Sequence, residues 1–262
     1  MQLRLNSAAD SVLLAADSLL LHPPVLISPH ALEIYVEICS QLRRPSTLPP
    51  AFELFANKSK PILQKDGSLI FKPRNPDRAE AAIQSDVAAQ ALAAAVSARE
   101  LGTAVALSKI CYASKAFRRQ KFLRYCTLPL AGACLAPVVA WYLAKAFTAW
   151  SPYVDPRTFH KSAFAGILTC MAATTTLAVM SKITWGGTKR VLWLPGTSMT
   201  DRYFRAEEML ALDSIVRAWG FEEPLRWGEE VGPDWDMLKE YCLMRHMIVD
   251  PIAMDDGKSK RS

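Results

Sequence analysis

The sequence predicts an all-α protein with a repeat-like helical amino-terminal domain, a two-helix transmembrane hairpin and a small helical carboxy-terminal domain. Three observations support this fold class. Residues 126–144 and 163–181 form two apolar runs, each close to the roughly 20 residues that a helix needs to cross a bilayer. Apolar side chains recur at helical spacing through much of the remaining chain. Positive charge is concentrated beside the two runs, as in membrane proteins.

Composition and charge exclude several other classes of protein. Of the 262 residues, 51% are hydrophobic and 21% are charged, which excludes a disordered chain, a collagen and a simple coiled coil. The six cysteines form no CxxC pair, which excludes a small disulfide-bonded scaffold. The net charge of +6 is uneven: residues 1–108 are neutral, residues 109–200 carry +11 and residues 201–262 carry −5.

Residues 1–108 are predicted to form a soluble domain of helix pairs. Ser28 and Pro29 mark one boundary clearly, because serine accepts a hydrogen bond from the first helical turn and proline fits the first helical position. Asp77 is expected to cap a later, alanine-rich helix. The last helix runs on through a basic juxtamembrane segment, residues 109–125. The expected helices cover residues 7–21, 29–44, 51–58, 77–98 and 103–125, with a loop over residues 59–77.

The transmembrane hairpin is assigned to residues 126–147 and 163–181, joined by a loop over residues 148–162. Pro137 is expected to kink the first span, because proline removes a backbone donor. Small residues recur at every fourth position of both spans, which lets helices approach closely in lipid. We therefore expect the spans to pack on each other, or to form homo- or hetero-oligomers, through Gly132, Ala136, Ala140, Gly166, Cys170 and Thr174.

Charge beside the spans predicts the orientation of the hairpin. Nine basic residues flank the terminal ends of the spans and two lie in the loop, so the positive-inside rule places both termini on one side. The side chains expected to contact membrane lipids are Lys115, Arg118, Arg119, Lys121, Arg124, Lys182, Lys189 and Arg190, with Trp185 and Trp193 as interfacial anchors.

The basic run before the first span has a second interpretation. It includes Tyr112, Phe117 and Phe122, and basic residues interleaved with aromatic ones are typical of nucleic-acid-binding segments. Because the run leads directly into an apolar span, we assign its charge to lipid headgroups. We do not expect nucleic acid as a partner.

Residues 182–262 are predicted to form an acidic, tryptophan-rich helical domain with a disordered basic tail. One helix is expected over residues 200–219, with Gly220 as its C-cap, and another over residues 234–248. Between and within them lies an acidic cluster, for which we expect a solvated face that suits a basic partner. A cation site or an acid–base pair is the alternative. The cluster consists of Glu222, Glu223, Glu229, Glu230, Asp234 and Asp236.

The sequence contains no recognisable catalytic or metal-binding motif. The four histidines are far apart, and HExxH, zinc-type and GxGxxG patterns do not occur. The sequence Gly257-Lys258-Ser259 lacks the earlier glycine of a phosphate loop. Cys39, Cys111 and Cys242 are expected to be packed rather than reactive. The sequence therefore predicts no cofactor and a function other than catalysis.

Two resemblances bear on the function. Residues 89–117, AQALAAAVSARELGTAVALSKICYASKAF, resemble one helix–turn–helix unit of tetratricopeptide or pentatricopeptide type, which implies a stack of helix pairs that binds a peptide or a partner helix. The pattern WLPGTS at residues 193–198, with Trp227-Gly228-Glu229-Glu230 and Trp235, resembles uncharacterised two-span mitochondrial inner-membrane proteins of fungi. That resemblance implies a location rather than a reaction.

These observations favour a membrane-anchored interaction or scaffold protein with protein partners. It would support the assembly, gene expression or organisation of mitochondrial inner-membrane complexes, with both termini in the matrix. The terminal sequence KSKRS suggests an alternative location in the endoplasmic reticulum membrane, with both termini cytosolic. An enzyme that acts on a membrane-embedded substrate through the acidic carboxy-terminal segment is the alternative function. A transporter component fits poorly, because neither apolar run contains Asp, Glu, Lys, Arg or His.

Overall fold

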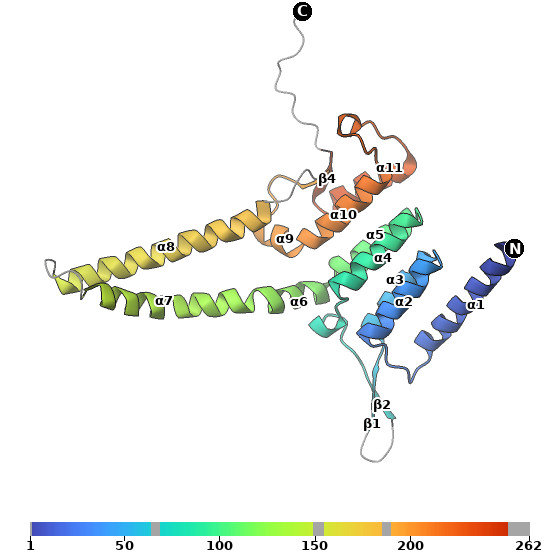
Figure 1. Cartoon of the computed structure of the whole chain (residues 1–262), viewed down its shortest axis with the longest axis horizontal. Helices are drawn as coiled ribbons and strands as arrows, with labels where there is room; N and C mark the ends of the chain where they lie inside the picture. The colour runs from blue at the N-terminus through green and yellow to red at the C-terminus, as the bar shows by residue number, and fades with distance from the viewer. Residues whose placement is uncertain (1, 64–68, 149–154, 185–189, 251–262) are drawn as a thin grey trace, which may run out of the picture. The chain divides into compact units, whose positions relative to one another are not determined.

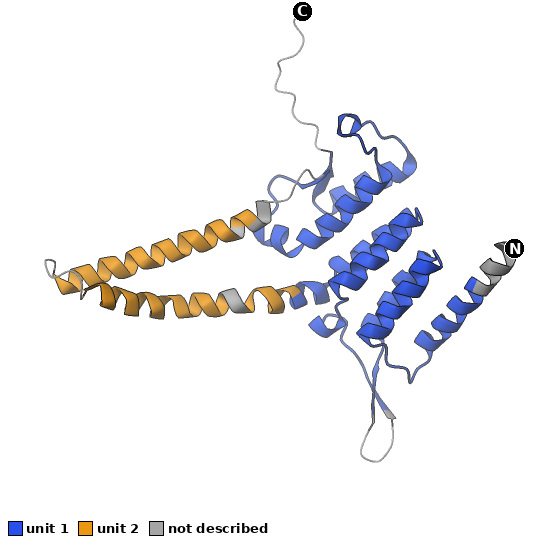
Figure 2. Cartoon of the chain, in the orientation of Figure 1, with its two compact units in different colours: residues 1–120, 189–262 blue, residues 121–188 orange. Residues whose placement is uncertain are grey.

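The computed structural model of the chain describes residues 2–63, 69–148, 155–184 and 190–250. These residues are mostly helical, with four short strands among them, which confirms the predicted dominance of helix. The chain divides into two compact units (Figure 2). Unit 1 comprises Met1–Gln120 and Lys189–Ser262, and unit 2 comprises Lys121–Thr188.

Unit 1 is a stack of helices to which both halves of the chain contribute (Figure 1). Helices α2 and α4 pack together, and α5 packs against α3, α4 and α10. The helices are α1 (Gln2–Leu21), α2 (Pro29–Gln41), α3 (Leu48–Asn57), α4 (Ser85–Ser97), α5 (Leu101–Tyr112), α9 (Met199–Phe204), α10 (Ala206–Trp219) and α11 (Pro233–Met244), and α6 (Lys115–Tyr125) runs from unit 1 into unit 2. Short 3₁₀ turns lie at Pro45–Thr47, Ala79–Ala81 and Pro224–Arg226.

One hydrophobic core runs through unit 1. It includes Val36 of α2, Phe52 of α3, Leu107 of α5 and Leu212 of α10, all of them buried. The predicted division into separate amino- and carboxy-terminal domains therefore differs from the structure. The reason is that the apolar face of α10 packs on α4 and α5 instead of pairing only with the next helix.

Local signals set several helix boundaries. Ser28 caps α2 as predicted, because its hydroxyl accepts a hydrogen bond from the Ala31 N–H at 3.1 Å. The predicted start at Asp77 is wrong: α4 begins at Ser85. The guanidinium of Arg74 donates to the carbonyl of Glu80, which a continuous helix would use for its next turn.

The predicted helix over residues 103–125 is interrupted. α5 ends at Tyr112, and α6 begins at Lys115. Ser114 caps the new helix, since its hydroxyl oxygen accepts a hydrogen bond from the Phe117 N–H at 3.2 Å. The basic juxtamembrane helix is therefore shorter than predicted.

Two antiparallel strand pairs were not predicted: one lies in the predicted loop over residues 59–77, and the other includes residues 247 and 248, which were predicted to be helical. Strands β1 (Lys60–Leu63) and β2 (Leu69–Lys72) form a hairpin, with Lys60 opposite Lys72 and Ile62 opposite Ile70. Strands β3 (Val191–Trp193) and β4 (Met247–Val249) bring the chain that follows unit 2 together with the chain that follows α11. This second pair sets the position of Arg190, which immediately precedes β3.

Unit 2 is a hairpin of two long helices, α7 (Thr127–Thr148) and α8 (Pro156–Thr184). Ala140 and Ala144 of α7 are completely buried, and Ala136 is half-buried, so the predicted small-residue stripe of this helix faces α8 along most of its length. Gly132 is exposed, with no atom near the position of a β-carbon, and it lies beyond the contact.

The stripe predicted on α8 is not the packing face. Gly166, Cys170 and Thr174 are exposed. The ring of Trp141 instead lies edge-on to His160 at 4.4 Å and to Phe164 at 5.9 Å, measured between ring centroids. These aromatic contacts bring a different face of α8 against α7, and Ala140 and Ala144 are buried beside Trp141 on the α7 side.

Candidate functional site

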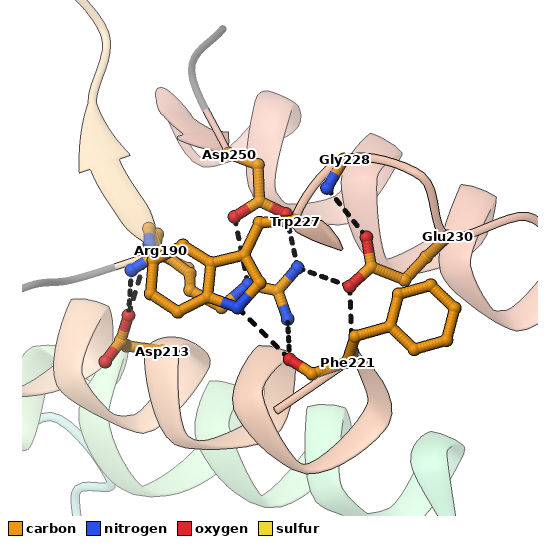
Figure 3. A network of polar contacts seen from close by, with 8 residues as sticks. Arg190, Asp213, Phe221, Trp227, Gly228, Glu230 and Asp250 are labelled. Atoms are coloured by element: carbon orange, nitrogen blue, oxygen red, sulfur yellow. Dashed lines mark hydrogen bonds and ion pairs between the residues drawn. The ribbon is translucent and has the colours of Figure 1, made fainter. Parts of the chain in front are cut away.

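A network of polar contacts is built around Arg190 in unit 1 (Figure 3). The side chain of Arg190 is 1% exposed, which is rare for a charged group that lacks partners. Three carboxylates contact the backbone or the side chain of Arg190 from separate parts of the unit. They belong to Asp213 on α10, Glu230 in the loop before α11, and Asp250 just after β4. The network therefore joins four segments that are distant in sequence.

The guanidinium of Arg190 uses nearly all of its donors. Its Nε donates to Oδ1 of Asp250 at 2.9 Å, and its Nη2 donates to the other oxygen of the same carboxylate, a two-pronged pairing. Nη2 also donates to Oε1 of Glu230 at 2.6 Å, and Nη1 donates to the carbonyl of Phe221 at 3.2 Å. Removing this side chain would leave two carboxylates buried without a counter-charge.

The third carboxylate holds the backbone rather than the guanidinium. Oδ1 of Asp213 accepts hydrogen bonds from the backbone N–H groups of Arg190 at 2.7 Å and Val191 at 3.1 Å. Its other oxygen pairs with Nε of Arg217 at 2.8 Å. Asp213 thereby fixes the start of β3 against α10.

Two indole rings complete the surroundings of the arginine. The Cζ atom of Arg190 lies 5.0 Å from the ring centroid of Trp227 and 5.1 Å from that of Trp235, within the range of cation–π attraction. The indole N–H of Trp227 donates to the carbonyl of Phe221 at 3.1 Å. Aromatic faces and carboxylates thus replace water around the buried charge.

Glu230 closes the loop between α10 and α11. Its Oε1 accepts a hydrogen bond from the Phe221 N–H, and its Oε2 accepts one from the Gly228 N–H, both at 2.8 Å. Gly220 is the C-cap of α10, as predicted, but its φ of −89° requires no glycine. Glycine is needed because a β-carbon there would lie 2.0 Å from Nη1 of Arg190.

A second buried ion cluster lies at the other end of α10. Glu208, about 1% exposed, pairs with Nε of Arg205 at 2.8 Å and with the guanidinium of Arg245. Nη2 of Arg205 also donates to the backbone carbonyl of Arg245 at 2.8 Å. This cluster ties the start of α10 to the end of α11, so both ends of α10 are joined to later parts of the chain.

The Arg190 network shifts the pKa of Glu230. Burial alone would raise it, but the Phe221 N–H, the Arg190 guanidinium and further backbone donors lower the pKa of this carboxyl to about 2. The unfolded value is about 4.3. The ionised carboxylate therefore contributes its full stabilisation at a pH above the unfolded-state pKa, and this contribution is lost as the pH falls toward 2.

Replacing Glu230 by glutamine is expected to lower the free energy of unfolding by about 3 kcal/mol at neutral pH. The difference from the parent chain should shrink steadily between about pH 4 and pH 2, because the parent loses the same interaction by protonation. Denaturant titrations followed by tryptophan fluorescence at several pH values measure this difference. The matched control is Glu229→Gln at the exposed neighbouring residue, which should hardly change the free energy of unfolding. If the free energy of unfolding depended on pH in the same way for the parent chain and Glu230→Gln, the assignment would be contradicted.

The loop that this network holds exposes an acidic surface. Glu222, Glu223 and Glu229 are exposed, as are Asp234 and Asp236 at the start of α11. Two large apolar side chains on the same loop are almost fully solvent-accessible, Leu225 at 97% and Val231 at 93%. The prediction of a solvated acidic face holds for the five exposed acidic residues. It does not hold for Glu230, which is buried and pairs with the Arg190 guanidinium.

The titratable groups at and near this site are paired or packed. Among the described residues, no group of three or more His, Cys, Asp or Glu side chains is placed to hold a metal ion. Burial raises the pKa of the Cys242 thiol to about 12 and also raises those of Cys39 and Cys111, so these thiols stay protonated and packed. The carboxylate of Glu230 is fully engaged by its donors, so it cannot act as a general base.

The structure separates the residues predicted to contact lipid. Lys115, Arg119 and Arg124 are exposed and Arg118 is half-buried, whereas Lys121 is buried. The assignment of Arg190 to the interface is wrong, because its guanidinium is buried inside unit 1, where it pairs with the carboxylates of Glu230 and Asp250. Trp193 is part of β3 and packs against the core beneath Arg205, so it is not an interfacial anchor. Trp185 and Lys189 lie outside the described residues, and Lys182 falls within α8.

Comparisons of this chain with protein-family models, with curated proteins and with solved structures found no match.

Proposed function

We propose that the chain is a membrane-anchored helical interaction protein, held in the bilayer by α7 and α8, whose acidic loop binds a basic protein partner. The observation that carries this proposal is the uncovered apolar surface of α7. The continuous helical stretch Lys115–Thr148 is long and apolar enough to cross a membrane, and among the described residues it is the one that meets this test. Almost none of its apolar part is covered by other residues of the chain.

The exposed side chains of α7 are large and contiguous. In water, an apolar surface of this extent would promote aggregation, whereas lipid covers it at no cost. Alternating small residues and Pro137 are common in transmembrane helices and do not weaken this interpretation. The exposed residues are Leu130, Leu135, Val138, Val139, Trp141, Tyr142, Leu143 and Phe147.

Hydroxyl groups on α8 support its assignment as the second span. Thr169, Thr175 and Thr176 each donate to the backbone carbonyl one turn earlier, at 2.7 or 2.8 Å, and Thr174 donates in the same way. A hydroxyl satisfied within its own helix adds little cost in hydrocarbon. α8 also exposes Leu177 and Met180 on its surface.

We place the protein in the mitochondrial inner membrane with both termini in the matrix, where it would support the assembly, gene expression or organisation of membrane complexes. The sequence resemblance to two-span fungal proteins and the positive charge at the terminal ends of the spans support this location. The endoplasmic reticulum membrane with cytosolic termini satisfies the same charge rule and is the alternative.

The expected topology is testable with tags at both ends. Alkaline carbonate should leave the full chain in the membrane pellet, because two spans anchor it. Protease added to intact mitoplasts should spare both terminal tags, because nine basic residues on the terminal side strongly disfavour translocation of the ends. Immunoblots of the two tags report the outcome.

Asn57 supplies an independent check on the same orientation. It begins a glycosylation acceptor sequence, Asn57-Lys58-Ser59, at the exposed end of α3. The proposed topology predicts that it carries no glycan. Cleavage of either tag in intact mitoplasts, release by carbonate, or a glycan on Asn57 would overturn the proposal.

The interaction function is tested at the acidic loop. Reversing two exposed charges with Glu222→Lys and Glu223→Lys should abolish recovery of the basic partner in mild-detergent purification, because the loop then repels it. The fold should survive, since neither side chain is buried. The control is Glu33→Lys with Glu37→Lys, an equal charge change on exposed positions of α2. A parent chain that purifies as a solitary monomer would exclude the interaction function.

A further inference from the structure

The hairpin of β1 and β2 extends away from the helices of unit 1 (Figure 1). Each strand pairs with the other and, among the described residues, with no third strand. Its apolar side chains are nevertheless exposed: Ile62 at 48%, Ile70 at 52% and Phe71 at 46%. A two-stranded ribbon is marginally stable in water, and exposed apolar strands favour a further contact.

Basic residues gather at the base of the same hairpin. Lys60 and Lys72 are direct cross-strand partners, an arrangement that is unfavourable without an anion between them. Together with Arg74 and Arg78 they line a pocket of about 280 Å³, whose one acidic lining residue is Glu80. Glu80 pairs with Lys60 at 3.1 Å, so the lining retains an excess of positive charge.

Arg74 is held firmly within this pocket. Its Nη1 donates to the carbonyl of Phe55 at 2.9 Å, its Nη2 donates to the carbonyl of Glu80, and its guanidinium carbon lies 4.6 Å from the ring centroid of Phe55. Its Nε is buried and makes no hydrogen bond within the described part of the chain. The pocket thus has one cation, Arg74, that is fixed by its contacts with the protein, and two lysines that line the same pocket.

We propose that this hairpin docks on the surface of an anionic bilayer, with a lipid phosphate in the Lys60, Lys72, Arg74 and Arg78 pocket and with Ile62 and Ile70 at the acyl boundary. Side chains alternate between the two faces of a strand, so the cross-strand pairs Lys60–Lys72 and Ile62–Ile70 lie on one face of the hairpin. Positive charge next to exposed apolar side chains is the combination that binds acidic lipid interfaces. A free phosphate would need the cations alone. An RNA strand would favour stacking aromatic rings, whereas both apolar side chains on this face are aliphatic.

This inference deepens the proposed function, because it names the lipid class that a membrane-anchored chain meets outside its spans. The proposed spans tether unit 1 to a membrane, which raises the effective concentration of lipid at the hairpin, so even weak docking is populated. Loss of docking and loss of anchoring therefore give different results.

The test uses the full chain with a photoreactive benzophenone amino acid in place of Ile70, on the same face as the two lysines. The protein is reconstituted in vesicles of phosphatidylcholine alone or of phosphatidylcholine with phosphatidylglycerol, and it is irradiated and analysed by mass spectrometry. Four basic and one acidic side chain line the pocket, and each net positive charge near an anionic surface favours binding about fivefold. We therefore expect lipid adducts at position 70 in the anionic vesicles and about a hundredfold fewer in the neutral ones. The same probe at Leu225, on the acidic loop, should form no lipid adduct in either.

Charge variants assign the effect to the pocket. Lys72→Gln with Arg78→Gln, introduced into the photoreactive chain, should reduce the adducts in anionic vesicles about twenty-five-fold, or fivefold for each charge removed. Lys109→Gln with Arg43→Gln removes two exposed charges elsewhere in unit 1 and should leave the yield unchanged.

Three results would overturn the inference: equal adducts in both kinds of vesicle, an adduct yield that Lys72→Gln with Arg78→Gln leaves unchanged, or adducts to added RNA in place of lipid. Retention of the chain in the carbonate pellet in all these variants shows that the spans remain intact, so failure of docking is distinguishable from failure of the anchor.

Discussion

Replacing Arg190 by methionine is expected to lower the free energy of unfolding of unit 1 by about 3–5 kcal/mol. Methionine fills much of the volume but leaves the carboxylates of Glu230 and Asp250 buried without a counter-charge. The indoles of Trp227 and Trp235 flank the arginine, so tryptophan fluorescence during denaturant unfolding reports the loss directly. The loop after α10 should also become sensitive to protease, because its main anchor is gone.

Two further variants define the cause. Arg190→Lys keeps the charge but not the fork of donors, so we expect an intermediate loss of stability. Arg217 also pairs with a carboxylate, that of Asp213, but its side chain is 51% exposed. Arg217→Ala should therefore lower the free energy of unfolding by less than about 1 kcal/mol. If Arg190→Met were no more harmful than Arg217→Ala, the network would not hold the loop.

Leu212→Ala is expected to destabilise unit 1 by about 3 kcal/mol and to loosen helices that precede it by more than a hundred residues. Leu212 is completely buried on α10, in the core shared with α4 and α5. Removing its side chain loses transfer free energy and leaves a cavity. Hydrogen exchange of backbone amides in α5 should accelerate along with that in α10, because one core unfolds cooperatively.

Leu210→Ala is the matched control on the same helix. Its side chain is 49% exposed, so the same chemical change should have little effect. Faster exchange confined to α10 in Leu212→Ala would indicate two independent domains, as the sequence analysis predicted, and would contradict the shared core.

Local features of unit 1 could be predicted from the sequence because they depend on neighbouring residues. The Ser28–Pro29 start of α2 and the Gly220 end of α10 are examples. The β1–β2 hairpin was missed although Asp66-Gly67 between two apolar segments is a known hairpin signal. The prolines and charges around it suggested a loop instead.

The Arg190 network could not be predicted because its partners are distant in sequence. Glu230 lies 40 residues and Asp250 lies 60 residues after the arginine, so no local pattern links them. Arg190 was predicted to contact lipid because it lies close to an apolar run in the sequence. Glu230 was predicted to be solvated because it belongs to a cluster of acidic residues. The packing face of α8 was missed for a similar reason, since a bulky contact from Trp141 overrides the stripe of small residues.

The discontinuous chain path of unit 1 has a consequence for biogenesis. The chain leaves this unit at Gln120 and re-enters it at Lys189, so α4 and α5 emerge from the ribosome long before α10. At 5–20 residues per second, the delay is roughly 5 to 20 s, during which the apolar faces that α10 will cover are open to chaperones. In the proposed topology, the hairpin of α7 and α8 emerges before α10 and can enter a bilayer before the core closes. A chain in which neither step has occurred presents two uncovered apolar surfaces to quality control at once.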